Sequence, residues 1–324
     1  MSIYVGCDLG GTNIKVGLVD VEDGSIIEVQ SAPTMAREGH DAVMARMADL
    51  IDKVIVDSGV PRNEIGGVGI GVPGSLDLEK GLVLFLPNLP GTWPNVPLVA
   101  TMTARLNLPI YILNDVRAIT FAEWKFGAGR GVDTMACFAI GTGIGGGLVI
   151  NGKLHLGING TAGELGHQTI DFNGPKCGCG NYGCVETYAS GPAIAAAAAR
   201  IVMQGGTTAI GEMVKYDLNK ITPRVVYEAA LAGDLTAQEV YRQAGEALGY
   251  GVSNVLVATG ARKVVIGGGV AAAGDLLLEP IRRVIRERVF VIPKEMVEIV
   301  LAELGTEAGI VGTALWASVH GYQD

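Results

Sequence analysis

The feature that most constrains the fold is a unit that occurs twice: an apolar strand, a glycine-rich turn and a second strand. The first copy is IYVGCDLGGTNIKVGLVD, from residue 3, and the second is MACFAIGTGIGGGLVINGKL, from residue 135. Two shorter apolar runs also end in glycines, IGGVGIGVPG and VVIGGG. Between them lie segments whose apolar residues recur at three- and four-residue spacing, which is typical of helices. The pattern predicts an α/β chain made of two related halves that face a cleft.

Start and stop signals locate several of the helices. We expect one helix over 40–59, which ends at a glycine, and another over 190–206, which begins with Ser-Gly-Pro and ends in paired glycines. The segment 225–260 reads as two or three helices.

Composition narrows the class of protein. At 324 residues the chain exceeds the usual size of a single core, and 49% hydrophobic with 18% charged residues is too apolar for disorder. A net charge of −9 without a Lys/Arg block argues against nucleic-acid and anionic-lipid partners. The N-terminus lacks a signal-peptide pattern, and the longest apolar stretch, 135–150, is too short and glycine-rich to span a bilayer. We therefore expect a soluble cytoplasmic protein.

The first glycine turn contains Asp8, Gly10, Gly11 and Thr12. Glycines after a strand let backbone N–H groups approach an anion, and the hydroxyl adds a donor. An aspartate beside a phosphate requires a cation between them, so Asp8 indicates Mg²⁺. The alternative is a hairpin turn with a surface aspartate.

The second glycine turn, 141–147, has five glycines in seven positions, which are costly to order without a ligand nearby. It has no Gly-Lys-Ser/Thr, and a strand rather than a helix follows, so it is neither a Walker A loop nor a Rossmann fingerprint. With glycines 267–269 it predicts a nucleotide cleft. The alternative is close strand packing in a glycine-rich core.

Asn114 and Asp115 follow the strand-like PIYIL. A carboxylate at a strand end suits a general base that takes a proton from a substrate hydroxyl. Spacing alone favours the alternative, an Asx turn or helix N-cap before VRAITFAEW.

His167, Cys177, Cys179 and Cys184 lie close together in a chain that has five cysteines. Zn²⁺ prefers four tetrahedral nitrogen and sulfur ligands, and we expect a structural zinc site here. The alternatives are a catalytic thiol, a redox pair or three free thiols. A zinc-fixed loop would also bring Glu164 and Glu186 towards His167, where two carboxylates and an imidazole could accept several sugar hydroxyls.

These motifs carry a resemblance to a known family. The chain resembles the ROK sugar kinases (repressor, open reading frame, kinase) over essentially its whole length. The motifs are, in order, DLGGT, GVPG, ILND, GTGIGGG, GELGH, CGCGNYGCVE and VIGGGV. The repressor branch carries an N-terminal helix-turn-helix that this chain does not begin with, so we expect an enzyme rather than a sugar-sensing regulator.

The resemblance implies the duplicated actin-like, ribonuclease H-like fold of sugar kinases and chaperone ATPases. It places residues 1–117 and 306–324 in the N-terminal domain, and 118–305 in a C-terminal domain with the second phosphate loop, the zinc site and the adenosine loop. A chaperone-like ATPase would need neither the sugar-binding carboxylates nor the cysteine turn. The family forms dimers and tetramers, so the resemblance also implies a homodimer or homotetramer.

The resemblance assigns a role to each motif residue, with Asp115 as the base that deprotonates the sugar 6-hydroxyl. The implied sugar contacts are Gly74, Asn88, Asn114, Asp115, Glu164, His167 and Glu186. The implied contacts to ATP and its Mg²⁺ are Asp8, Gly10, Gly11, Thr12, Lys15, Thr142, Gly143, Gly268 and Gly269. The implied Zn²⁺ ligands are His167, Cys177, Cys179 and Cys184.

One segment indicates which sugar is the substrate. Asn88-Leu89-Pro90-Gly91-Thr92-Trp93 resembles the Asn-Leu-Pro-Gly-Trp segment of the glucokinase members, with an inserted threonine. We expect D-glucose, with mannose tolerated. Fructose, allose, N-acetylmannosamine and N-acetylglucosamine are the alternatives, and polyphosphate is the alternative donor to ATP.

Overall fold

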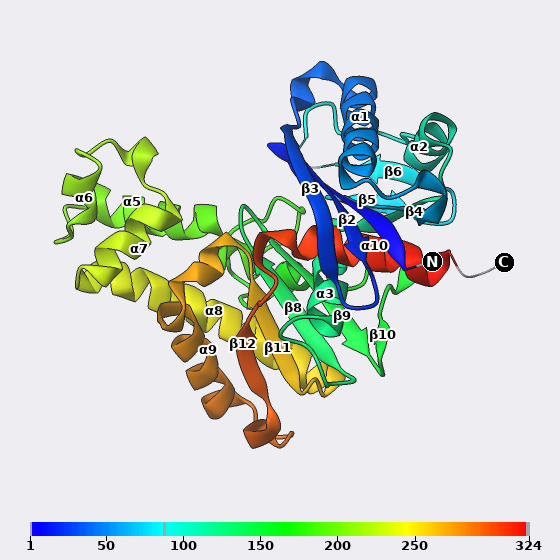
Figure 1. Ribbon diagram of the computed structural model, residues 1–324. Coiled ribbons are helices and arrows are strands. Elements are labelled where there is room, and N and C mark those ends of the chain that lie inside the picture. The colour runs from blue at the N-terminus through cyan, green and yellow to red at the C-terminus, as the bar shows by residue number, and fades with distance from the viewer. Residues whose placement is uncertain (1, 87–88, 322–324) are drawn as a thin grey trace. The chain divides into compact units, whose positions relative to one another are not determined.

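The computed structural model describes residues 2–86 and 89–321, which form two compact units (Figure 1). Unit 1 runs to Arg130 and also includes Leu154–Ala162 and the chain from Glu303 onward. Unit 2 contains Gly131–Lys153 and Gly163–Ala302. The chain therefore passes between the units four times.

Unit 1 is built on a five-stranded sheet with the order β3-β2-β1-β4-β7. Strand β1 pairs antiparallel with β2 and parallel with β4, and β4 pairs parallel with β7. A small hairpin, β5 (Ser75–Asp77) and β6 (Leu82–Phe85), and helices α1 (His40–Ser58) and α2 (Leu98–Leu106) complete this part of the unit. The strands of the large sheet are β1 (Ile3–Leu9), β2 (Asn13–Asp20), β3 (Ser25–Pro33), β4 (Ile65–Val72) and β7 (Ile110–Asn114).

Unit 2 repeats this arrangement with the order β10-β9-β8-β11-β12. Strand β8 pairs antiparallel with β9 and parallel with β11, and β11 pairs parallel with β12. The shared strand order and orientation confirm the predicted duplication of an α/β, ribonuclease H-like unit. The strands are β8 (Met135–Ile140), β9 (Ile144–Ile150), β10 (Lys153–Leu154, of which Leu154 belongs to unit 1), β11 (Lys263–Gly267) and β12 (Glu298–Leu301).

The predicted helices of the chain are confirmed. Helix α1 ends at Gly59, which has a φ of 70°, and α5 (Gly191–Met203) begins at Ser190, whose side chain caps it. The segment 225–260 contains two helices, α7 (Pro223–Leu231) and α8 (Leu235–Thr259). Helix α8 packs against α9 (Asp275–Arg288), and α4 (Glu186–Ala189) and α6 (Ile210–Met213) are short.

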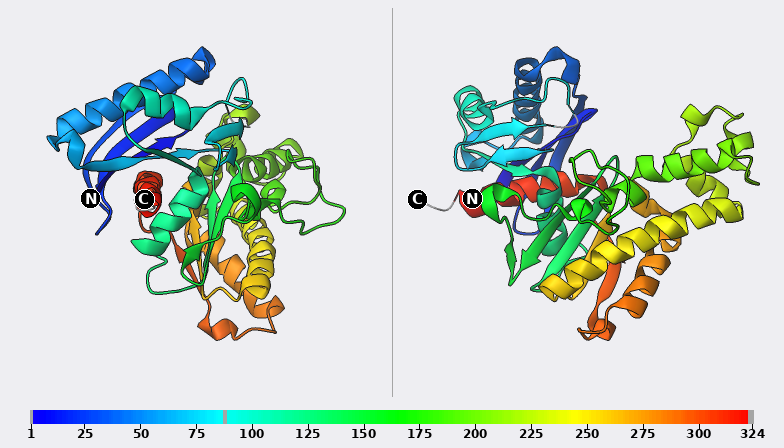
Figure 2. Two further views of the ribbon diagram at one scale, coloured as in Figure 1. Left: turned by 90° about the vertical axis from the view of Figure 1, so that its right-hand side faces the viewer. Right: turned by 180° about the vertical axis from the view of Figure 1, so that it is seen from behind.

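Helix α10 (Ala308–His320) is the centre of unit 1, and every residue from Ala308 to Ser318 is buried. It lies between the sheet and helix α3 (Asp115–Lys125), as the left view of Figure 2 shows. Glycines allow backbone to lie directly on backbone there. A Cβ on Gly69 of β4 would be 1.8 Å from the carbonyl oxygen of Thr313, and a Cβ on Gly312 would be 1.8 Å from that of Ala118. The packing interpretation of glycine-rich strands therefore holds for this part of the chain.

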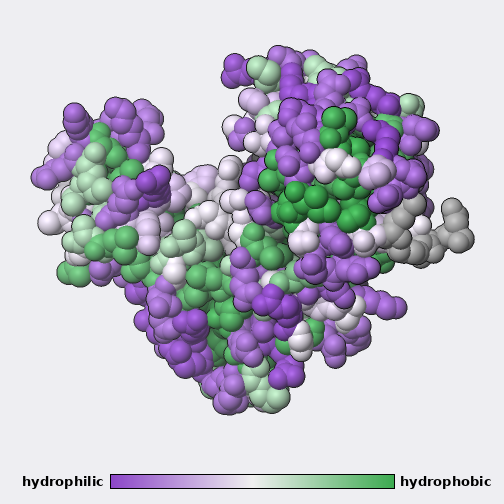
Figure 3. Space-filling model, viewed as in Figure 1, coloured by the Kyte–Doolittle hydropathy of each residue, from purple (hydrophilic) through white to green (hydrophobic). Residues whose placement is uncertain are grey.

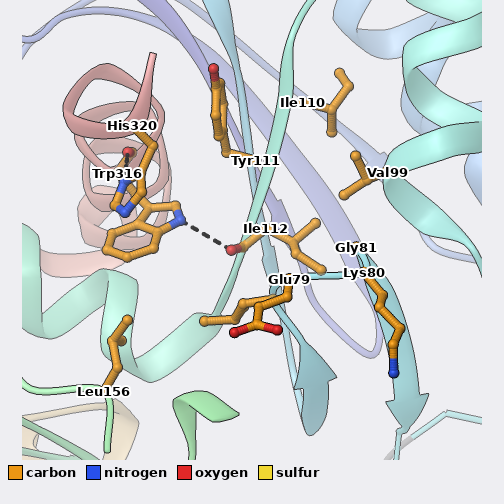
Figure 4. Close-up of a pocket in the computed structure, with 11 residues that line it drawn as sticks. Glu79, Lys80, Gly81, Val99, Ile110, Tyr111, Ile112, Leu156, Trp316 and His320 are labelled. Atoms are coloured by element: carbon orange, nitrogen blue, oxygen red, sulfur yellow. Dashed lines mark hydrogen bonds between the residues drawn. The ribbon is translucent and has the colours of Figure 1, made fainter. Parts of the chain in front are cut away.

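Two hydrogen bonds fasten the end of α10. The indole Nε1 of Trp316 donates to the carbonyl oxygen of Ile112 at 3.0 Å, and the His320 ring lies over Trp316 with Nδ1 3.0 Å from its carbonyl oxygen (Figure 4). A cavity of about 400 Å³ opens beside them, also lined by Glu79 and Lys80. None of the predicted site residues lines it.

The boundary expected near residue 117 falls inside α3, whose contacts with α10 keep the whole helix in unit 1. Unit 1 also gains Leu154–Ala162, because Leu154 and Leu156 pack against its buried Leu113 and Phe121. On the face of unit 1 seen in Figure 3, hydrophobic side chains gather over the edge strand β3, where Ile27 and Val29 are exposed. Among residues 2–86 and 89–321, no helix has the length and apolar character needed to cross a membrane.

Candidate functional site

Four metal-binding side chains meet in unit 2. The ligand atoms of His167, Cys177, Cys179 and Cys184 all lie within 4.8 Å of one another. The Cys177 sulfur is 3.6 Å from His167 Nδ1, and the sulfurs of Cys179 and Cys184 are 3.8 Å apart. Tetrahedral Zn–S and Zn–N bonds of about 2.0–2.3 Å place neighbouring ligand atoms roughly 3.5–3.8 Å apart. The cluster therefore fits zinc, and its sulfur separation is far beyond the ~2.05 Å of a disulfide.

The loop that carries the cysteines depends on two glycines with left-handed backbone. Gly180 has a φ of 94° and donates to the carbonyl oxygen of Cys177, and Gly183 has a φ of 62°. A Cβ on Gly183 would lie 1.7 Å from the carbonyl oxygen of Asp171. Burial raises the pKa of Cys184 to about 12, so without metal this thiol is protonated at neutral pH. Metal binding would therefore have to displace its proton.

Glu186 joins the cysteine loop to the second glycine turn. Its Oε2 accepts from the backbone N–H of Ile144 at 2.8 Å, and its Oε1 is 3.7 Å from the Cys177 sulfur. A Cβ on Gly143 would be 2.5 Å from Glu186 Oε2, so a larger residue there would displace the carboxylate. Glu164 precedes the short 3₁₀ turn that contains His167, and its carbonyl oxygen accepts from the His167 N–H at 3.1 Å. One side of unit 2 thus holds His167, Glu186 and the cysteines together.

The glycines of the turn 141–147 have different surroundings. A Cβ on Gly141 would meet nothing within 4 Å, and Thr142 is exposed. A Cβ on Gly146 would instead lie 2.6 Å from the Leu165 side chain. The packing interpretation therefore holds for the second half of the turn, whereas its tip is open and nucleotide binding there stays a prediction.

The open tip borders a cavity of about 720 Å³, a size that suits a small-molecule ligand. Gly141 and Thr142 line it, and so does Gly269 from the turn after β11. Gly268, with a φ of 84°, packs tightly on the backbone of Ile140 instead.

Sequence reasoning missed most of this cavity's wall. It comes from the start of α7 and from α8: Thr222, Pro223, Arg224, Tyr227, Glu228 and Tyr241. The Tyr241 hydroxyl donates to the carbonyl oxygen of Pro223 at 2.9 Å. Thr222 and Pro223 form a helix start that the sequence analysis did not identify, and no local spacing relates that start to the glycine turns.

The first glycine turn lies in unit 1, after β1. Gly10 donates to the carbonyl oxygen of Asn13 at 3.0 Å, and the buried Thr34 holds the turn from the other side, donating from its hydroxyl to Gly10 at 2.7 Å and from its N–H to Thr12 at 2.8 Å. Thr34 is another residue that the sequence reasoning missed. Gly11 is exposed in this turn.

Asp8 stands beside this turn in a charged environment. The pKa of Asp8 is raised to about 6, chiefly by burial and also by the nearby Asp115 carboxylate, while Lys15 acts in the opposite direction. The carboxylate lies against the start of α10, since a Cβ on Gly309 would be 2.8 Å from Asp8 Oδ2, and Lys15 Nζ donates to the Thr306 carbonyl at 3.2 Å. Two neighbouring carboxylates in a partly buried site are a suitable environment for a divalent cation.

Asn114 ends β7 and caps α3. Its side-chain oxygen accepts from the N–H groups of Val116 and Arg117, which is the N-cap interpretation of this motif. Its Nδ2 also donates to the carbonyl oxygen of Gly74 at 3.3 Å. The cap fixes Asp115 as the first residue of α3, near Asp8. Asn88 lies outside the described residues.

Comparison with known proteins gives a consistent result. A family model described as "ROK family" matches residues 4–319. A glucokinase from Halalkalibacterium halodurans is 35% identical over 95% of this chain and 93% of its own. A xylose repressor from Caldicellulosiruptor bescii is 33% identical over 95% of this chain and 76% of its own length.

A solved structure extends this comparison. It is a ROK family glucokinase from Streptomyces griseus in complex with glucose and AMPPNP, which is 32% identical. The TM-score is 0.83, with 98% of this chain and 99% of that chain covered.

Proposed function

The chain belongs to the ROK family, and we propose that within it this protein is an ATP-dependent kinase that phosphorylates the 6-hydroxyl of D-glucose, with mannose tolerated. The observation that carries the proposal is the cavity of unit 2. Its lining includes Thr142 and Gly269, two residues from different turns that the resemblance assigns to ATP. The complex of a related glucokinase with glucose and AMPPNP supports the same pair of substrates.

In the proposed reaction Asp115 accepts the proton of the 6-hydroxyl as that oxygen attacks the γ-phosphorus. A new P–O bond forms, the bond to the β-phosphate oxygen breaks, and ADP leaves with its electron pair. Asp8 would hold Mg²⁺, which would supply positive charge to the phosphates. The N–H groups of the turns at Gly10 and Gly141 would bind the phosphate oxygens.

The sugar hydroxyls would be bound by Asn114 in unit 1 and by Glu164, His167 and Glu186 in unit 2. Zinc would fix the loop that carries the last two, as a structural ion rather than the reacting centre. Closure of the two units would align the 6-oxygen with the γ-phosphate. In the segment assigned to glucose, Leu89 and Trp93 are buried in the core of unit 1, which would anchor it.

The test is ADP release from Mg-ATP with a panel of hexoses at several concentrations. We expect the highest kcat/KM for D-glucose and a lower one for mannose. Asp115→Asn should lower kcat by roughly 10²–10⁴-fold while glucose still binds. Asp41→Asn is the matched control, because Asp41 is also an aspartate in the first turn of a unit 1 helix, and it is exposed. Unchanged turnover in Asp115→Asn would remove the assigned role.

A sugar-sensing regulator is the second candidate, favoured by the 33% identity to a xylose repressor. It predicts hexose binding without turnover, with either ATP or polyphosphate as donor. Strong turnover of fructose, allose or an N-acetylated hexosamine would instead keep the kinase and change its substrate.

A further inference from the structure

Helix α3 contacts the chain wherever it passes between the two units. The passages follow residues 130, 153, 162 and 302. These points are far apart in sequence, so no local pattern links them. In unit 1 side chains of α3 form hydrogen bonds next to three of the passages, and the chain at the fourth packs against a cluster that includes α3 residues.

Glu123 holds two of the passages. It is fully buried, and its carboxylate accepts three backbone N–H groups: Ala128 at 2.9 Å, Glu303 at 3.1 Å and Leu304 at 2.8 Å. Ala128 lies two residues before the first passage, and Glu303 directly follows the last. Gly127 leaves the space for this arrangement, since a Cβ there would be 2.1 Å from Glu123 Oε2.

Arg117 and apolar residues of α3 contact the chain at the other two passages. Arg117 is 2% exposed, and its Nε donates to the carbonyl oxygen of Ala162, the last residue before the third passage, at 2.8 Å. Leu154, directly after the second passage, packs against a cluster that includes Ala118 and Phe121 of α3. Two buried, oppositely charged side chains and one apolar contact therefore connect all four passages to one helix.

We propose that α3 is the hinge anchor of this protein, and that Glu123 and Arg117 are positioning residues that couple movement of the units to Asp115. The proposal rests on the proposed kinase function, in which Asp115 is the base. Because Asp115 is the first residue of α3, a loosened passage would shift it relative to the substrate oxygen. A misplacement of about 1 Å can cost roughly 10²-fold in rate.

The test compares Glu123→Gln with Arg130→Gln. Glutamine keeps the shape, but its NH₂ group faces N–H donors, so at least one backbone amide loses its acceptor. Arg130→Gln removes the exposed Arg130–Glu303 ion pair at the same passages and leaves the carboxylate in place. Hydrogen exchange of the ligand-free protein is read at Ala128, Glu303 and Leu304, and turnover is read with D-glucose and Mg-ATP.

In Glu123→Gln we expect exchange at both separated segments to speed up about 10-fold or more together, and kcat to fall about 10–100-fold with little change in glucose affinity. Arg130→Gln should match the wild type. Unchanged exchange would overturn the anchor, and altered exchange with wild-type kcat would overturn the coupling. If the wild type phosphorylates no hexose, the proposed function is refuted, but the anchor is not, because hydrogen exchange tests the anchor without any substrate. If Glu123→Gln does not fold, Arg117→Lys should give the same pattern over residues 156–164.

Discussion

Gly69→Ala tests the backbone contact that seats α10 on the sheet of unit 1. The new Cβ would lie 1.8 Å from the Thr313 carbonyl oxygen, 1.2 Å short of the 3.0 Å that such contacts require. Neither β4 nor α10 can move away easily to relieve this clash. Strand β4 is paired on both edges, to β1 and β7, and α10 cannot retreat because Gly312 already touches the Ala118 carbonyl of α3.

Overpacking of a core costs about 1–3 kcal/mol, and a backbone clash without an escape belongs at the upper end. A loss of about 3 kcal/mol corresponds to roughly 6–12 °C in the melting temperature of a unit of this size. Gly71→Ala is the matched control, because it lies on the same strand and faces the same residue. The atom nearest to its Cβ would be the Thr313 methyl at 3.0 Å, and backbone atoms of Cys7 and Asp115 would lie at ordinary contact distances of 3.6 and 3.7 Å, so we expect a loss of about 1 kcal/mol or less.

Urea denaturation followed by tryptophan fluorescence is a selective assay. All three tryptophans, Trp93, Trp124 and Trp316, belong to unit 1. The fluorescence midpoint should fall in Gly69→Ala and change little in Gly71→Ala. Equal, small losses in the two variants would refute the argument that α10 lies backbone-on-backbone against β4.

Three other outcomes are expected. Purified protein should contain about one zinc per chain, and Cys179→Ser should lower that content; metal analysis that finds none in folded protein would contradict the site. The hydrogen bond from Arg242 lowers the pKa of Glu239 to about 2 from 4.5, so the pair adds stability above pH 4.5 that disappears as the pH falls towards 2. Because solvent screens this partly exposed pair, Arg242→Met should lower the free energy of unfolding by about 1 kcal/mol at pH 7 and by less at pH 3. Urea midpoints measured by circular dichroism test this, and an equal difference between wild type and variant at both pH values would disprove it. Tyr227 lines the cavity proposed for ATP, where we expect its ring to stack on the adenine. Tyr227→Ala should therefore raise the KM for ATP about 10-fold and leave that for hexose unchanged, with the exposed Tyr250→Ala as control; equal effects of the two variants would exclude the stacking.

The sequence predicted those parts of the fold and site that depend on short-range patterns. The two glycine turns follow strands that occupy equivalent places in the two sheets, so their repetition was visible as a repeat of residues. The four candidate metal ligands lie between residues 167 and 184, and turn glycines fold that short segment on itself, so their spacing in the sequence was informative. The cap at Asn114 was also predictable, because it involves only the next three residues.

Features made by distant segments could not be predicted in this way. The cavity wall at Tyr227 meets Gly141 and Gly269 only through the fold of unit 2. Glu123 sits in an ordinary helical pattern, and nothing near it indicates that its carboxylate binds residue 303. The glycines packed against α10 could not be distinguished from those of the ligand turns, because a glycine in the sequence does not show whether a phosphate or a helix backbone occupies the space beside it.

The position of α10 in the chain has a consequence for biosynthesis. The strands β1, β2, β3, β4 and β7 of unit 1 leave the ribosome before unit 2, yet the helix at its centre follows residue 302. During synthesis its sheet must wait with an uncovered apolar face while the intervening unit 2 emerges and can fold first. Unit 1 is therefore completed last although it is begun first. Nascent chains stalled before α10 should depend on chaperones, and release of the final helix should end that dependence.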